Sequence, residues 1–128
     1  MVRWSIAAVA VILVAASACV VCSTRWSNYV VIRNSSGAQI TDVKLVLNSI
    51  DGKWSREHEV SNLAAGDEIA IHHTRNDTSA ELSFLLAGST HAHSESYIDL
   101  WRGEGWFFDV QFDGHVNSGY DNSYSRSD

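Results

Sequence analysis

Histidine is the residue type in this chain best suited to chemistry, and two of the six histidines are spaced to act together. His91 and His93 are separated by one residue, so on a β-strand both rings project from one face, about 6.6 Å apart along the chain. Two imidazoles placed in this way can converge on one metal ion at about 2.0–2.1 Å, which suits Zn²⁺ or Cu²⁺. Glu95 continues the same face, and His73 or His58 on a neighbouring strand would complete the ligand set. The spacing therefore predicts a candidate metal site at His91 and His93.

A second interpretation of the same pair needs no metal. His91, His93 and Glu95 are also typical of a polar strand face that is in contact with water, in a chain that is rich in histidine. Protonation of such a face near pH 6 would make it a pH-sensitive contact surface. The sequence leaves both interpretations open.

The sequence contains no recognisable catalytic motif that would place these residues for a reaction. Serine, histidine and aspartate are abundant, but the chain contains no G-x-S-x-G elbow to place a nucleophile. Two carboxylate pairs stand out, Asp99 with Glu104 and Asp109 with Asp113. Asp109 and Asp113 alternate with an apolar row, which places them on the solvated face of a strand. We therefore expect neither an enzyme nor a bound cofactor.

Three aromatic residues near the C-terminal end form a candidate binding surface. Trp106 fits an inward row, whereas Phe107 lies on the opposite face from Phe108 and is expected to be exposed. Together with Trp101, an exposed aromatic group at a sheet edge would suit a sugar, a peptide or a partner strand. The alternative is that loops cover both faces of the sheet.

Alternation of apolar and polar residues with a period of two positions these groups on β-strands. Asp51-Gly52 and Asp113-Gly114 are strong hairpin signals, because a type I′ turn needs positive φ. The final inward row is Trp106, Phe108, Val110 and Phe112. The expected strands cover residues 29–33, 43–47, 54–60, 69–73, 80–86, 91–100 and 106–112, the last closing onto Val116.

These short strands and Gly/Asn/Asp turns, without an amphipathic helix, predict an all-β fold. We expect a small immunoglobulin-like antiparallel β-sandwich of six to seven strands, after one N-terminal hydrophobic helix. A small closed barrel is the alternative.

The N-terminal helix is expected from residues 4–22, which carry no charge and lie between Arg3 and Arg25. As a helix they extend about 28 Å, just short of a hydrocarbon core of about 30 Å. The segment has three possible fates: an uncut anchor, cleavage after residues 16–18, or a lipobox in which Cys19 is acylated and becomes the lipid anchor. Each fate places residues from about 23 onward outside the cytoplasm.

Net charge limits the partners of the part of the chain that follows residue 23. Without residues 1–23 the chain keeps eight Lys and Arg (nine less Arg3) against 15 Asp and Glu, a net charge of −7. Such an acidic chain repels phosphate backbones, so nucleic acid is not an expected partner.

Both cysteines, Cys19 and Cys22, lie at the end of the apolar segment. The exported domain must therefore be held by its hydrophobic core and not by disulfides.

The expected organisation is an anchor or lipoprotein signal over residues 1–23, a spacer over 24–28, a β-sandwich domain over 29–116 and a disordered polar tail over 117–128. The apolar start, the run VIRNSSG at 31–37 with Ile40 and Val43, LAAGD at 63–67, Tyr97-Ile98 and the segment 106–116 resemble small envelope-anchored bacterial β domains of uncharacterised function. The resemblance covers about residues 29–116.

The resemblance implies a fold and a location but no activity. Together with the anchor, it predicts a membrane-anchored, extracytoplasmic accessory or interaction domain of the bacterial cell envelope. Its expected partners are the membrane, through the N-terminal segment, and another envelope protein. The alternative is a metal-binding envelope domain that uses His91 and His93.

Overall fold

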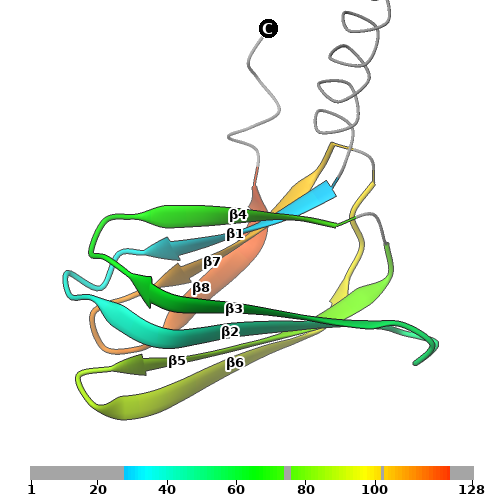
Figure 1. The fold of residues 1–128 in the computed structure, drawn as a ribbon. Helices are drawn as coiled ribbons and strands as arrows, with labels where there is room; N and C mark the ends of the chain where they lie inside the picture. The colour runs from blue at the N-terminus through cyan, green and yellow to red at the C-terminus, as the bar shows by residue number, and fades with distance from the viewer. Residues whose placement is uncertain (1–27, 74–75, 102, 122–128) are drawn as a thin grey trace, which may run out of the picture.

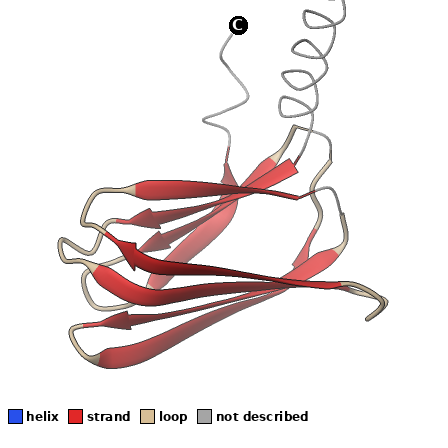
Figure 2. Ribbon diagram, in the orientation of Figure 1, coloured by secondary structure: helices blue, strands red, loops and turns tan. Residues whose placement is uncertain are grey.

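The alternating sequence folds into two β-sheets that face each other, as a computed structural model shows for residues 28–73, 76–101 and 103–121 (Figure 1). Figure 2 shows strands and connecting loops and, over these residues, no helix. The strands described are β1 (Asn28–Asn34), β2 (Ile40–Ser49), β3 (Ser55–Leu63), β4 (Glu68–His73), β5 (Thr78–Leu86), β6 (Ser89–Ile98), β7 (Gly105–Val110) and β8 (Val116–Asp121). The all-β prediction is confirmed for the described residues.

Each sheet has four strands, in the orders β4-β1-β7-β8 and β3-β2-β5-β6. The neighbours pair antiparallel, except that β1 and β7 pair in parallel, with Tyr29 opposite Gly105 and Asn34 opposite Val110. The expectation of six to seven strands, all antiparallel, was therefore wrong in these two respects.

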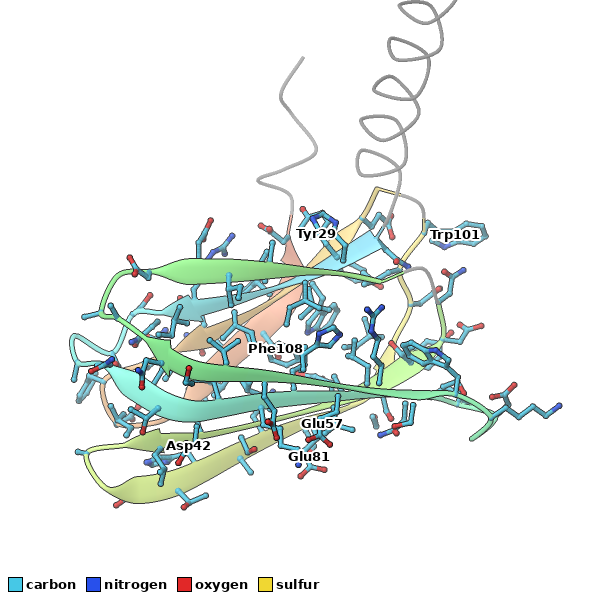
Figure 3. The ribbon with its side chains drawn as sticks, viewed as in Figure 1. Tyr29, Asp42, Glu57, Glu81, Trp101 and Phe108 are labelled. Carbon is cyan, nitrogen blue, oxygen red and sulfur yellow. The ribbon has the colours of Figure 1, made fainter. Side chains whose placement is uncertain are left out.

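One apolar core fills the space between the sheets. Leu45 and Leu47 of β2 and Leu82 and Phe84 of β5 point towards the opposite sheet and are almost completely buried. Phe108 of β7 meets them from the other sheet and has no exposed surface (Figure 3). Rows contributed by both sheets supply the apolar area that a disulfide-free domain needs.

The last inward row is one residue shorter than the alternation predicts. Trp106 packs against the core and Val110 is buried, but Phe112 is 81% exposed. The strand ends at Val110, because the Gln111 N–H donates to the His115 carbonyl and the chain turns there. Phe112 therefore lies on a turn, where period-two alternation no longer applies.

The outer face of the sheet β4-β1-β7-β8 is also partly covered, by its own aromatic side chains. Tyr29 lies across Gly105, so close that a Cβ at Gly105 would be 2.6 Å from the tyrosine oxygen. Phe107 lies over Gly119 in the same manner, and a Cβ at Gly119 would be 3.3 Å from the Phe107 ring. Val31, which pairs with Phe107, is completely buried, so β1 is covered on both faces.

The chain enters and leaves the described fold at one end, which we call the entry end. β1 and β7 begin there and β4 and β8 finish there, as their register requires. The Tyr29 hydroxyl donates to the Asp121 carbonyl at 3.2 Å, which ties the first strand to the last. The opposite end, the far end, carries the turns at 35–39, 64–67, 87–88 and 111–115 (Figure 1).

The predicted domain boundaries need one correction. β8 extends from Val116 to Asp121, so the polar tail does not begin at residue 117. Its backbone pairs with β7 from Val110↔Val116 to Gly105↔Asp121, and this ladder needs no apolar side chains. The predicted N-terminal helix, the cleavage site, Cys19 and residues 122–128 lie outside the described residues. Within the described ranges there is no helix long and apolar enough to span a membrane.

Candidate functional site

The polar face predicted on β6 lies at the edge of the space between the sheets. His91, His93 and Glu95 stand opposite Phe84, Leu82 and Ala80 of β5, all buried core residues, and so share the inner face. All three are half-buried, whereas their neighbours in the strand are exposed. The expectation that they share a face is confirmed, but the face is not the fully solvated one of our second interpretation.

A hydrogen-bonded cluster of three side chains joins the edges of the two sheets at this point. The His93 Nε2 atom lies 2.9 Å from Glu95 Oε1 and 3.3 Å from the Ser118 hydroxyl of β8. The Ser118 hydroxyl itself donates to Glu95 Oε1. His93 also meets Phe108 edge-on, with ring centroids 5.9 Å apart. The cluster therefore links β6 of one sheet to β8 of the other.

The electrostatics of the cluster favour an ionised Glu95. Burial alone would raise the pKa of this carboxyl, but hydrogen bonds from Ser118 and His93, with the charge on His93, hold it below its usual value. Hydrogen bonding to the charged form thus outweighs the desolvation of a group whose side chain is 25% exposed. His93, Glu95 and Ser118 therefore serve as hydrogen-bond partners for one another.

This geometry differs from that of a nucleophile relay. In a serine–histidine–carboxylate relay the hydroxyl meets one ring nitrogen and the carboxylate meets the other. Here Ser118 and Glu95 both approach the same nitrogen of His93, and the serine proton goes to the carboxylate. The contacts support a role in joining the sheets.

His91 has different partners from His93. Its ring stacks on Phe84 with centroids 5.4 Å apart and planes 17° apart. It also lies against Gly114, where a Cβ would come within 2.7 Å of His91 Nε2. A metal site that used both histidines would require His91 to leave these two contacts.

The additional metal ligands considered from the sequence lie elsewhere. His58 is on β3, which β2 and β5 separate from β6, and His73 ends β4, at the opposite edge of the other sheet. Over the residues that the structure describes, no three His, Cys, Asp or Glu side chains form a group able to hold a metal ion. The metal site at His91 and His93 stays a prediction, without a third ligand.

Two of the four carboxylates paired in the sequence, Glu104 and Asp113, cap turns. Glu104 accepts the Trp101 N–H at 2.9 Å, and Asp113 accepts the His115 N–H at 2.9 Å. Asp99 lies just before the first turn and Asp109 lies within β7. These bonds hold the loops in place and do not bring two carboxylates together.

The three predicted aromatic residues have three different environments. Trp101 is 66% exposed and points away from the fold at the entry end (Figure 3). Phe107 is half-buried, with the Arg33 guanidinium 5.5 Å from its ring centroid. Trp106 packs on the core and meets Tyr120 edge-on at 5.0 Å. Of the three, only Trp101 offers a largely open surface.

A groove of about 550 Å³ lies beside the entry end and was not expected from the sequence. Its lining residues are Ser49, Ile50, Asp51, Asn76, Asp77 and Tyr97. The Tyr97 hydroxyl donates to Asp77 Oδ1 at 2.7 Å, and this bond, more than burial or charge, raises the pKa of Tyr97 to about 12. The β2–β3 hairpin signal predicted the turn but not the tyrosine that meets it.

Comparisons with known proteins show distant likeness in structure and none in sequence. No family profile and no curated protein match the chain. An NMR structure of a protein from Eubacterium rectale aligns with a TM-score of 0.49 at 14% identity, over 81% of this chain and 95% of the other. A predicted cell adhesion protein from Bacteroides ovatus aligns with a TM-score of 0.49 at 13% identity, over 76% of this chain and 43% of the other.

Proposed function

We propose that the chain is a membrane-tethered, extracytoplasmic interaction domain of the cell envelope, built as an immunoglobulin-like sandwich that presents its far end to a partner protein. The tether is the uncharged stretch at residues 4–22, as an uncut helix or as a signal replaced by a lipid on Cys19. The resemblance to envelope-anchored β domains supports the same location.

The position of the tether supports a contact role for the far end. The tether joins the fold at Asn28, the first residue of β1, and β1 leads away from this point towards the far end. Strands rise about 3.3 Å per residue, so the six residues of β7 carry the chain about 20 Å from the entry end. The far end is therefore the part held furthest from the membrane.

The observation that carries the proposal is Phe112. Its side chain is 81% exposed, the largest fraction among the exposed large apolar residues of the described chain. The turn that bears it is fixed by bonds of 2.8 Å from the Gln111 N–H to the His115 carbonyl and 3.0 Å from the Gly114 N–H to the Gln111 carbonyl. An aromatic side chain on a turn whose backbone is already fixed loses little backbone freedom on binding and gains by leaving water.

Site-specific photocrosslinking in native membranes tests the proposal. A benzophenone amino acid replaces Phe112 in the full chain, and a matched variant carries it in place of Ile50, which is 54% exposed at the entry end. We expect a discrete protein adduct from position 112 that position 50 does not give. The same adducts from both positions, or no protein adduct from position 112, would contradict a contact role for the far end.

Membrane retention tests the tether in the same preparation. The full chain is expected to stay with the membrane pellet after washing at alkaline pH. Its release into the wash would refute the tether, whatever the crosslinks show.

A further inference from the structure

Most of the exposed large apolar side chains of the described chain lie at the entry end. Four of the five large apolar side chains that are more than half exposed lie there: Ile50 (54%), Tyr97 (54%), Trp101 (66%) and Tyr120 (53%). Hydrogen bonds connect their loops, because the Tyr120 hydroxyl donates to the Asp99 carbonyl at 3.1 Å and the Ile50 N–H donates to the Asp77 carbonyl at 3.0 Å. We call these four residues the entry surface.

Trp101 is fixed next to the point where the chain enters the fold. The backbone N–H of Trp101 donates to Glu104 Oε2 at 2.9 Å, and the backbone N–H of Glu104 donates to the Trp101 carbonyl at 3.1 Å. The side-chain amide of Asn28, the first residue of β1, donates to the carbonyl of the preceding Leu100 at 3.2 Å. The backbone of Trp101, a residue that is two-thirds exposed, is thus held beside the first residue of β1.

The length of the tether keeps this surface close to the membrane. From Cys22 at the end of the apolar stretch to Asn28 there are six residue steps, which span at most about 20 Å when fully extended. A lipid on Cys19 would lengthen this limit to about 30 Å. The headgroup layer outside the hydrocarbon is itself about 5–8 Å thick. Whether the tether is an uncut helix or a lipid on Cys19, the entry surface stays within reach of the headgroups.

We propose that the entry surface rests on the headgroup layer of a zwitterionic phospholipid membrane, with Trp101 as its main contact. This inference rests on the proposed tether. Tryptophan and tyrosine suit that layer, because each has an apolar ring and a polar atom that stays hydrated. Ile50 adds apolar area without polar groups that would need partners.

The charge near the entry surface decides the class of lipid. The charged residues in the described loops of this end are Asp51, Asp77, Asp99 and Glu104 against Lys53. The balance in these loops is three acidic charges in excess (four minus one). An excess of negative charge is repelled by anionic headgroups and tolerated by zwitterionic ones.

Quenching of tryptophan fluorescence by brominated lipid tests the proposal. The full chain is reconstituted in phosphatidylcholine vesicles whose acyl chains carry bromine close to the headgroup. Three proteins are compared: the wild type, Trp101→Phe, and Trp101→Phe with Phe112→Trp, which moves an indole to the far end. Quenching of the other four tryptophans, Trp4, Trp26, Trp54 and Trp106, is common to all three proteins and cancels in the differences.

We expect Trp101→Phe to lose part of the quenched signal and Phe112→Trp not to restore it. Phosphatidylglycerol in the vesicles should reduce the component due to Trp101. If wild type and Trp101→Phe are quenched equally while the chain floats with the vesicles, the inference is wrong and the tether stands. If the chain does not float with the vesicles, the tether itself is wrong.

Two further outcomes would also overturn the inference. Shielding of Trp101 from aqueous iodide without quenching by bromine would mean that protein, not lipid, covers the entry surface. A Trp101 component that grows with phosphatidylglycerol would contradict the assignment to zwitterionic lipid.

Discussion

Replacing Gly105 by alanine should destabilise the fold, because the aromatic cover of the outer sheet face leaves no room for a methyl group. A Cβ at Gly105 would clash with the Cε2 and Cζ atoms of Tyr29 and lie 2.6 Å from the tyrosine oxygen, whereas real Cβ contacts are essentially never below 3.0 Å. Tyr29 is only 5% exposed, and it must move, which breaks its 3.2 Å hydrogen bond to the Asp121 carbonyl. β1 and β8 would then lose this link.

The expected loss can be estimated from three contributions. Overpacking costs about 1–3 kcal/mol, and the lost hydrogen bond about 0.5–1.5 kcal/mol. Alanine is favoured over glycine within a strand by roughly 0.5–1 kcal/mol, which offsets part of the cost. The net loss is about 0.5–4 kcal/mol, and each kcal/mol corresponds to a fall in Tm of roughly 4–8 °C in a domain of this size.

Gly119→Ala is the matched control on the same sheet face. There a Cβ would meet Phe107 at 3.3 Å, and this half-buried ring can shift by the few tenths of an ångström required. Neither glycine has a positive φ, so backbone strain does not distinguish the two variants. We expect Gly119→Ala to stay within about 0.5 kcal/mol of the wild type, as surface substitutions usually do.

Thermal unfolding of the full chain in mild detergent, followed by circular dichroism, measures both variants. A double-mutant cycle with Tyr29→Ala isolates the clash, because adding Gly105→Ala to that background should cost nothing. Equal stability of Gly105→Ala and wild type, or an equal loss in Gly119→Ala, would refute the packing argument. So would a loss that persists in the Tyr29→Ala background.

Three further predictions concern titrating groups. Because the pKa of Glu95 is lowered in the fold, the contribution of this carboxylate to stability is complete above pH 4.5 and is lost as the pH falls through its folded-state pKa. Glu95→Gln should therefore reduce the loss of stability below pH 4.5 in a stability–pH profile. Burial, and then the charge of Arg56, lower the pKa of His58, so stability should fall as the pH drops below 6.5, and His58→Gln should remove that slope in chemical unfolding. One tyrosine should ionise near pH 12 in an ultraviolet titration, and Asp77→Asn should return Tyr97 to the ordinary range near pH 10; a Tyr97 that already ionises near 10 in the wild type would contradict the bond to Asp77.

Strand positions were predictable from the sequence because buried and exposed residues alternate along most strands. The row of Leu82, Phe84 and Leu86 predicted β5, and Asp51-Gly52 predicted the turn between β2 and β3. The strand β8 was missed, because its sequence VNSGYD has little apolar character and its place is fixed by backbone bonds to β7. The parallel pairing of β1 with β7 joins segments about 70 residues apart and leaves no local signal.

The candidate site was predictable only in part, for a related reason. Alternation shows that His91, His93 and Glu95 share a face, but it does not show which face of β6 is covered, since both faces are polar. The orientation is decided by the neighbouring apolar strand β5 and by Ser118 across the gap. Ser118 could be assigned to the site only once β8 was known.

The two ends of the fold differ in a way that the proposed short tether would explain. In that arrangement a spacer of at most about 20 Å would limit how far the entry end can move from the membrane. Exposed rings at that end, Trp101 and Tyr120 among them, can be covered by lipid without a partner protein. In the proposed arrangement the membrane would not cover Phe112, which is 81% exposed, because at least a strand length of about 20 Å separates the two ends. A second protein would then have to cover Phe112, and Phe112 is the position at which that partner is to be sought.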